Sequence, residues 1–488
     1  WVKAKRNTFG TLFLDCYEYA LPQRQQFSSA QMSGQQRHEH LYDGTALDAV
    51  DQLAASLLGQ LTPPWTQWFG LRPGQDIEDE NREALAVILE KAAKTIQAHF
   101  DRSNFSVEMH QCFLDLVVGG TASLLVEEAQ PGAMSAFKFS SVPLHEIVLD
   151  EGDSGFLDIA HRRLTLTPAQ MMKRYPFADI DHDDFSKGDE EFSVLESVVP
   201  DDTAYHFTAI LEEGQRVLVD VRLPRSPFIN FRWMKSPGEV YGRSPVMKSL
   251  PDIKTANKVV ELILKNASIA ISGIWQADDD GVLNPANIEL TPGSIIPKAV
   301  GSKGLTPLDM PARFDVSQLV LDDLRGRIRH AMLIDRLPQV GSRQMTATEV
   351  IERSAEMSLI MGATYGRLQS ELLTPLIQRA FEILRRRGEV PDISIDGRHV
   401  EIDYRSPLAR AQSQRSVQNT ISWMGTVQGM GAESMQVANT PEIAKYLGEA
   451  LGVPSDLVRT PQPLDIEAVA GVLNDVAQHT EGGDVFNA

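Results

Sequence analysis

The segment Arg336-Leu-Pro-Gln-Val-Gly-Ser-Arg-Gln-Met-Thr-Ala-Thr-Glu-Val350 joins a short cationic loop to the first turn of a helix. Its first half carries a proline, a glycine and two cations, Arg336 and Arg343. In its second half, Thr346 and Glu349 have the spacing of a capping box, in which the threonine hydroxyl accepts from a first-turn N–H and the glutamate reaches back to the cap. The stretch therefore predicts a loop that is followed at once by a helix.

The helix is predicted to run from Ala347 toward Arg387, about 41 residues and roughly 60 Å if it is unbroken. Pro375 should bend it, because a proline inside a helix removes one backbone hydrogen bond. The sequence Arg385-Arg386-Arg387-Gly388 marks its end: cations suit the negative end of the helix dipole, and glycine suits a left-handed cap.

Upstream of the loop, two helices are predicted over 244–270 and 316–335. Pro251 should kink the first helix or delay its start. Between them, 271–312 is rich in glycine, proline and β-branched residues, which favours a small β module.

The N-terminal half is predicted to contain both helices and strands, so the fold class is α+β. Helical periodicity marks 43–58, 79–100, 107–118 and, more briefly, 168–175. The chain after 405 also reads as helical. Short runs between Gly, Pro and Asp residues are typical of strands. These runs are Ser123–Glu127, Ala136–Phe139, Glu146–Leu149, Asp158–Leu166, Tyr205–Leu211 and Arg216–Arg222.

The 488 residues are enough for two to four compact units, and they carry a net charge of −20. Such a surface repels nucleic acid as a whole, so a role on DNA would depend on locally placed cations. Two cysteines, Cys16 and Cys112, exclude a disulfide framework and suit a reducing cytoplasm. No apolar run approaches the length of a membrane-spanning helix, and the N-terminus lacks a signal-peptide core.

Catalytic and metal-binding motifs are not evident. The chain lacks a P-loop, Gly-x-Ser-x-Gly and His-Glu-x-x-His. The acidic run 179–190 follows a calcium-loop template, but Asp184 replaces its turn glycine and Lys187 takes a ligand position. A solvated acidic loop is therefore favoured there, and a charged turn tip at Asp278-Asp279-Asp280. We expect no catalytic residue, no metal and no cofactor.

Two sets of cations each lie within about 40° on one helical face at 100° per residue. One interpretation is that they face a nucleic acid. The other is that they form ordinary solvent-facing ion pairs, since Glu261 and Asp322 stand three or four residues from a member of each set. The sets are Lys254, Lys258 and Lys265 on the first helix, and Arg325, Arg329 and Arg336 on the second.

An ordered series of segments carries a family resemblance. The segments are Leu53–Phe69, Phe100–Phe105, Leu116–Leu125, Pro227–Trp233, Tyr241–Pro245, Met345–Arg353 and Leu368–Leu376. In that order they resemble the portal, or head-to-tail connector, proteins of short-tailed bacteriophages. The resemblance covers roughly residues 40 to 420.

The resemblance implies a portal fold and a ring, typically of twelve subunits, around a channel for double-stranded DNA. Its implied parts are a wing with an α+β body, two stem helices, a clip that contains β structure, a tunnel loop, a long wing helix with a following strand, and a helical crown. The wing corresponds to 1–243, and the two stem helices correspond to 244–270 and 314–335, with the clip between them at 271–313. The tunnel loop corresponds to 336–346, the long wing helix with its following strand to 347–404, and the crown to 405–488.

The resemblance also assigns roles to residues. Arg336 and Arg343 would form two rings of cations in an otherwise acidic channel, so that DNA slides instead of sticking. The further channel candidates are Arg329, Arg325, Lys254, Lys258 and Lys265; on the clip, the docking candidates are Trp275, Asp278, Asp279 and Asp280.

The implied protein is not an enzyme. It sits at the portal vertex of the virion, after assembly in the host cytoplasm, and it has no membrane partner. Its implied partners are further copies of itself, DNA, the terminase large subunit, a tail adaptor, and the major capsid and scaffolding proteins. Two alternatives are a metal-dependent nucleic-acid-processing enzyme that uses the acidic clusters, and a structural capsid or scaffold protein.

Overall fold

The computed structural model describes most of the chain. The described residues are 2–24, 27, 39–64, 66–74, 76–77, 79–176, 178, 190–272, 275–276, 306–307, 314–336, 361–393, 395, 397–431, 437–438 and 440–451. Several predictions fall outside them: the capping box and Arg343, the acidic run 179–189, and the turn tip at 278–280. For Trp275 and Arg336 the backbone is described and the side chain is not.

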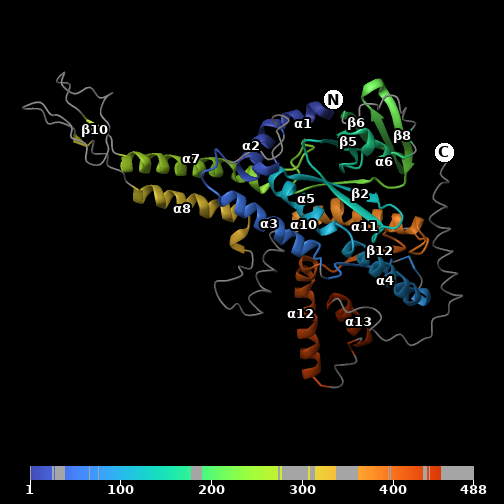
Figure 1. The fold of residues 1–488 in the computed structure, drawn as a ribbon. Coiled ribbons are helices and arrows are strands. Elements are labelled where there is room, and N and C mark those ends of the chain that lie inside the picture. Colours follow the sequence, from blue (N-terminus) through green and yellow to red (C-terminus); the bar gives the residue numbers. More distant parts are fainter. Residues whose placement is uncertain are drawn as a thin grey trace, which may run out of the picture.

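In the described part of the body, the two larger sheets are antiparallel. A three-stranded sheet has the order β3-β2-β9, and a five-stranded sheet has the order β4-β5-β6-β7-β8. Figure 1 shows the two sheets in the upper right of the molecule, with helices α5 and α11 close to β2. The strands are β2 (Thr121–Glu128), β3 (Phe137–Val142), β4 (Ile147–Asp150), β5 (Ile159–Leu166), β6 (Phe192–Asp201), β7 (Ala204–Leu211), β8 (Arg216–Leu223) and β9 (Phe228–Arg232).

The two edges of the five-stranded sheet differ. Helix α1 (Val2–Thr8) lies against β4, and the Lys5 ammonium contacts the buried Asp150 carboxylate at 2.8 Å. At the other edge, strand β8 pairs with β7 and has no second partner strand among the described residues. The short helix α6 (Pro168–Arg174) is capped by a box in which Thr167 accepts from the Gln170 N–H.

The main core is formed by helices on the three-stranded sheet. These helices are α2 (Gly10–Ala20), η1 (Pro22–Arg24), α3 (Thr45–Leu61), α4 (Asp79–Asp101) and α5 (Phe105–Gly119). Their apolar faces pack with the strands into one cluster. Stacked rings fill its centre: Trp68 lies 5.9 Å from Phe100, and Phe100 lies 4.9 Å from Phe105, between ring centroids. These aromatic rings are therefore part of the buried core.

A remote strand pair closes the far side of this core. Strand β1 (Phe69–Pro73) pairs with β12 (Val400–Tyr404), about 330 residues later, in antiparallel register. The Arg405 side chain then reaches the buried Glu90 of α4 at 3.1 Å. A methyl group on Gly70 would meet that guanidinium at 2.5 Å, so the glycine makes room for the ion pair.

Two long helices project from the body as a hairpin. Helix α7 (Pro245–Ser272) runs outward, α8 (Phe314–Ala331) returns beside it, and the strands β10 (Trp275–Gln276) and β11 (Thr306–Pro307) pair at its tip (Figure 1). The turn η5 (Ile334–Arg336) follows α8. Both predicted helices are thus present. Pro251 was predicted to kink this helix or to delay its start. The late start is wrong, because the helix begins at Pro245 and continues through that proline, and the kink stays a prediction.

The predicted long helix is interrupted where it is described. Helix α10 (Gly362–Leu368) leads into a π turn (Gln369–Leu373), and α11 (Thr374–Arg386) continues from it. Pro375 lacks an N–H and would clash with the carbonyl four residues earlier, so one extra residue in the turn accommodates its ring. The Thr374 hydroxyl donates to the Gln369 carbonyl at 2.9 Å. The bend predicted at Pro375 stays a prediction, and what the structure shows just before this proline is a π turn. The predicted left-handed glycine cap is present at Gly388.

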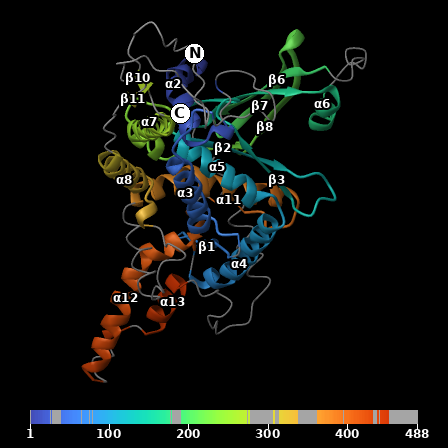
Figure 2. The same cartoon turned by 60° about the vertical axis from the view of Figure 1, so that its left-hand side comes forward.

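The C-terminal part is helical where it is described. Helix α12 (Pro407–Gly429) leaves the body, and α13 (Thr440–Leu451) lies beside it (Figure 2). Three strands of the body were absent from the sequence prediction: β1, β6 and β9. A further helical turn, η3 (Glu213–Gln215), separates β7 from β8.

Candidate functional site

The hairpin of α7 and α8 is rooted by the motif Tyr241-Gly-Arg-Ser-Pro245. The Ser244 hydroxyl accepts from the Met247 N–H at 2.9 Å and donates to the Val118 carbonyl at 2.8 Å. It is therefore both the N-cap of α7 and a link to α5. Pro245 follows as the first helical residue, where its missing N–H costs nothing. The buried Tyr241 hydroxyl accepts from the Leu149 N–H at 3.0 Å.

Two glycines let the backbone cross at this root. Gly120 ends α5 with φ +71°, and a methyl group on it would lie 2.4 Å from the Gly242 carbonyl oxygen. A methyl group on Gly242 would lie 2.2 Å from the Gly120 carbonyl oxygen. Both distances are far below any real Cβ contact, and the opposing atoms are backbone. The start of α7 is thus fixed against the α5–β2 junction by the absence of two side chains.

The two helices of the hairpin pack along apolar faces. From α8, Leu321, Leu324 and Ile328 are buried against α7, which presents partly buried Val260 and Ile263. An ion pair of 2.7 Å between Arg327 and Asp252 links the helices beside this seam. Near the body, α7 also contacts α2 and α5, and α8 also contacts α3.

The predicted lysine set lies on one face of α7, and all three lysines have acidic partners. Glu261 lies between Lys258 and Lys265, at 2.9 and 2.6 Å. Lys254 reaches Asp15 of α2 at 2.7 Å and lies 5.4 Å from the centre of the Tyr19 ring. Hydrogen bonds from the two lysines lower the pKa of Glu261, so it stays ionised. In the single chain, Lys258 and Lys265 thus form ion pairs within α7, and Lys254 pairs with a neighbouring helix.

Arg325 of the second set is held by the chain just before α3. Its guanidinium contacts the Asp43 carboxylate at 2.7 Å, and Asp43 also accepts from the Thr45 N–H at 3.0 Å. Burial by itself would raise the pKa of Asp43, but hydrogen bonds from Thr45 and Arg325 outweigh it and lower the pKa. Asn257 of α7 accepts from the Tyr42 N–H at 2.7 Å. The base of the hairpin is therefore tied to the body from both helices.

Arg329 differs from Arg325. It is exposed on α8 and makes no ion pair with any residue that the structure describes. Arg336 ends the η5 turn, where its backbone is described. The structure therefore brings Arg325 and Arg329 onto one side of α8 without joining them to the α7 lysines by any described contact.

Large apolar side chains are exposed on the outer half of the hairpin. Leu262 and Leu264 are about half exposed on α7, and Val320 of α8 is similar. Leu319 of α8 is 74% exposed. All four side chains are thus exposed to solvent in the single chain.

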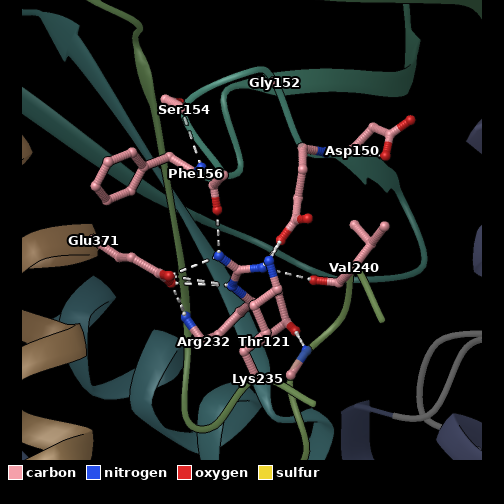
Figure 3. A network of polar contacts seen from close by, with 12 residues as sticks. Thr121, Asp150, Gly152, Ser154, Phe156, Arg232, Lys235, Val240 and Glu371 are labelled. Carbon is pink, nitrogen blue, oxygen red and sulfur yellow. Dashed lines mark hydrogen bonds and ion pairs between the residues drawn. The ribbon is translucent and has the colours of Figure 1, made fainter. Parts of the chain in front are cut away.

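A buried arginine holds the π turn to the body, as Figure 3 shows. Arg232 of β9 is 0% exposed, and all five of its guanidinium donors are satisfied. Nη2 and Nε contact Glu371 at 2.7 and 3.2 Å, Nη1 contacts Glu151, and the Val240 and Gly155 carbonyls accept at 3.1 and 3.0 Å.

Glu371 is the central acceptor of this network. It also accepts from the Arg232 backbone N–H at 2.9 Å and from Arg367 of α10 at 3.0 Å. Burial alone would lower the pKa of Arg232, but hydrogen bonds and charge from Glu371 raise it. The network thus fixes α10 and the π turn against β9. Arg232 and Glu371 lie in two of the segments that carry the family resemblance, but their pairing was not predicted. The sequence offers only one signal for it, a single charged residue inside each of two largely apolar stretches.

A second buried carboxylate holds the N-terminal helices. Asp115 of α5 accepts from the Tyr17 hydroxyl at 2.8 Å and contacts Arg24 at 2.6 Å. Burial raises the pKa of Asp115 to about 6, although the Arg24 charge opposes this. Over the described ranges, no three His, Cys, Asp or Glu residues are grouped as metal ligands. In the same ranges, we find no helix with the length and apolar character of a membrane span.

Comparisons with known proteins agree with the family resemblance of the sequence. A family model described as bacteriophage head to tail connecting protein matches residues 1–458. A probable portal protein of Bordetella phage BPP-1 is 24% identical, covering 94% of this chain and 87% of that protein. The portal protein of Salmonella phage epsilon15 is 23% identical, covering 99% and 91%. The portal protein of Escherichia phage T7 is 20% identical, covering 80% and 74%.

Among solved structures, a chain from the neck of an empty gene transfer agent particle is similar over 86% of this chain and 96% of that chain. Its sequence identity is 12% and its TM-score is 0.35, which is too low to carry a structural argument.

Proposed function

Because the chain belongs to the family of bacteriophage head to tail connecting proteins, we propose that its copies close into a ring of about twelve subunits at one vertex of a phage capsid. Double-stranded DNA would pass through the ring during packaging and ejection. The ring would also dock the packaging motor first and tail proteins later. In this role the chain performs no catalysis.

One observation carries the proposal beyond family membership. The α7–α8 hairpin is firmly rooted, projects from the body, and exposes Leu262, Leu264, Leu319 and Val320 in the single chain. A hairpin that met only solvent would keep such residues on its seam. Contact with neighbouring copies around a ring would cover them, in the way that obligate interfaces bury apolar surface.

The ion pairs of the hairpin fit a sliding contact with DNA. If the lysine face of α7 lines the channel, each phosphate must compete with Glu261 or Asp15 for a cation that is already paired. The net attraction is then small and is screened by salt. In this proposal, Arg329, Arg336 and Arg343 supply the local attraction.

The remaining parts keep the assignments that the resemblance suggests. The hairpin would be the stem, and its tip, with Trp275 and the three aspartates at 278–280, would be the clip that docks the terminase large subunit and the tail adaptor. Residues 1–243 would form the wing, and α12 and α13 would begin the crown. Capsid and scaffolding proteins would contact the outer surface.

The ring is tested by native mass spectrometry and negative-stain imaging of the purified chain. Rings of uniform size with a central passage are expected. The paired variant Leu262→Gln with Leu319→Gln should shift the population toward folded monomer. Val107→Gln, which changes an exposed apolar residue of α5 outside the hairpin, should leave the rings intact. A monodisperse monomer in the unaltered chain would contradict the proposal.

The channel role is tested with variants of equal charge change. Arg336→Ala with Arg343→Ala should leave rings intact and alter DNA packaging or retention. Lys258→Ala with Lys265→Ala removes two cations that Glu261 already neutralises, so its effect should be much smaller. Unchanged packaging and retention in the arginine variant would refute the channel role. Metal-dependent nuclease activity that Asp181→Asn abolishes would favour the enzyme alternative instead.

A further inference from the structure

Two arginines are buried in the part of the chain that the structure describes, and they are satisfied very differently. Arg232 is 0% exposed and uses every donor, as described above. Arg379 of α11 is 6% exposed, and its Nη1 donates one long hydrogen bond, 3.3 Å, to the Arg225 carbonyl. Its Nε is buried without an acceptor among the described residues. A buried guanidinium in that condition lacks a counter-anion.

The carboxylates near Arg379 are already used. Three of them act on it through charge without a hydrogen bond to it. Each one contacts another cation within about 3 Å: Glu127 contacts Arg174 at 3.0 Å, Glu128 contacts Arg386 at 3.1 Å, and Glu382 contacts Arg385 at 3.0 Å. Among the residues that the structure describes, Arg379 therefore has no carboxylate partner of its own.

A second cation makes the position of Arg379 less favourable still. Burial and the neighbouring charge of Arg386 lower the pKa of Arg379 to about 10. The pKa of Arg232 moves the other way, because Glu371 and Glu151 outweigh its burial. Arg232 and Arg379 are thus similarly buried, but among the described residues only Arg232 contacts a carboxylate.

We propose that Arg379 and Arg386 form an oxyanion-binding site where α11 meets the end of β2 and the chain at Arg225. The ligand is a phosphate or a carboxylate group, whose oxygens match the parallel N–H donors of a guanidinium. It would supply the missing acceptor of Arg379 and would compete with Glu128 for the Arg386 guanidinium. Figure 1 shows α11 beside β2, at the side of the body away from the hairpin.

Two sources have this chemistry. One is free inorganic phosphate, which needs only the single chain. The other is a carboxylate side chain of a neighbouring copy, and this source rests on the proposed ring.

The site is tested by thermal unfolding of the full chain in sodium phosphate, against sodium chloride at matched ionic strength. Phosphate should raise the melting temperature in a saturable way, since it binds the folded chain. Arg386→Gln removes one charge-assisted contact and should raise the half-saturating concentration about tenfold. Arg379→Gln should abolish the response. Arg385→Gln is the matched control on the same helix, and its response should equal that of the unaltered chain.

A response that is absent, non-saturable or equal in all variants would overturn the proposal. Should Arg379→Gln fail to fold, Arg386→Gln still decides, because its side chain is half exposed. The measurement is then repeated on assembled rings. Loss of the phosphate response in rings identifies a carboxylate of the neighbouring copy, and its persistence identifies a free ion. If the chain forms no ring, the first measurement stands by itself.

Discussion

Replacing Glu371 by glutamine should destabilise the folded chain more than its small chemical change suggests. In Glu371→Gln, one carboxylate oxygen becomes an NH₂ group. In the unaltered chain, one carboxylate oxygen of Glu371 accepts from the Arg232 backbone N–H at 2.9 Å, and the other accepts from Arg232 Nη2 at 2.7 Å. Arg232 Nε lies 3.2 Å from each oxygen. Whichever way the amide is turned, a donor would face a donor, and the charge of a fully buried guanidinium would lose its main partner.

The expected loss is about 3–5 kcal/mol of the free energy of unfolding, the usual result of removing one partner from a buried ion pair. Glu239→Gln is the matched control, since Glu239 pairs with Arg243 on the surface, where side chains are about a third exposed. That pair should contribute about 0–1 kcal/mol. Replacing both Arg232 and Glu371 with apolar residues of similar size should recover part of the loss.

Urea unfolding followed by tryptophan fluorescence measures the difference, provided that the slope against urea stays the same. The reasoning fails if Glu371→Gln costs no more than Glu239→Gln, or if it lowers the free energy of unfolding by less than about 1 kcal/mol. Limited proteolysis provides a second readout. The chain before α10 should be cut faster in the Glu371 variant, because the network no longer holds that helix to β9.

Three further predictions concern the root of the hairpin and the buried carboxylates. Gly242→Ala places a methyl group 2.2 Å from the Gly120 carbonyl and should abolish stable folding, whereas Gly366→Ala, with no atom within 4 Å, should be neutral or stabilising by up to about 1 kcal/mol in thermal unfolding. The folded-state pKa of Asp115, about 6, lies above its ordinary value of about 3.9, so the folded chain binds that proton more tightly and stability should fall as pH rises between these values. Asp115→Asn should remove this slope, and a slope that persists in denaturant titrations at several pH values would show that another group causes it. Arg325→Gln leaves a buried carboxylate without its cation and should cost about 1–3 kcal/mol in the same titration, with no cost if the contact is only superficial.

Local sequence patterns predicted the helices because their apolar residues repeat with the helical period. The helices over 43–58, 79–100 and 107–118 are present with boundaries shifted by a few residues at most. Strand β9 was missed for a physical reason. All five residues of Phe228–Arg232 are buried, so the alternation that marks a half-exposed strand is absent. Strand β1 was missed because its partner, Val400–Tyr404, lies far away in the sequence.

The candidate site could be predicted only in part. The cations of the hairpin were identifiable from their spacing on two helices. The partners of Lys254 and Arg325 were not, because Asp15 and Asp43 come from the N-terminal chain and meet the hairpin only through the tertiary fold. The same holds for Arg232 and Glu371, which are 139 residues apart.

The π turn before Pro375 also sets how α10 is rotated about the helix axis relative to α11. One additional residue in a turn rotates everything upstream by about 100° relative to an uninterrupted α-helix. A side chain before Gln369 therefore points about a quarter-turn or more away from the direction that a continuous helical wheel assigns to it. Removing a single residue between 369 and 373 would leave α11 in place and rotate α10, so that α10 would present a different face to β9.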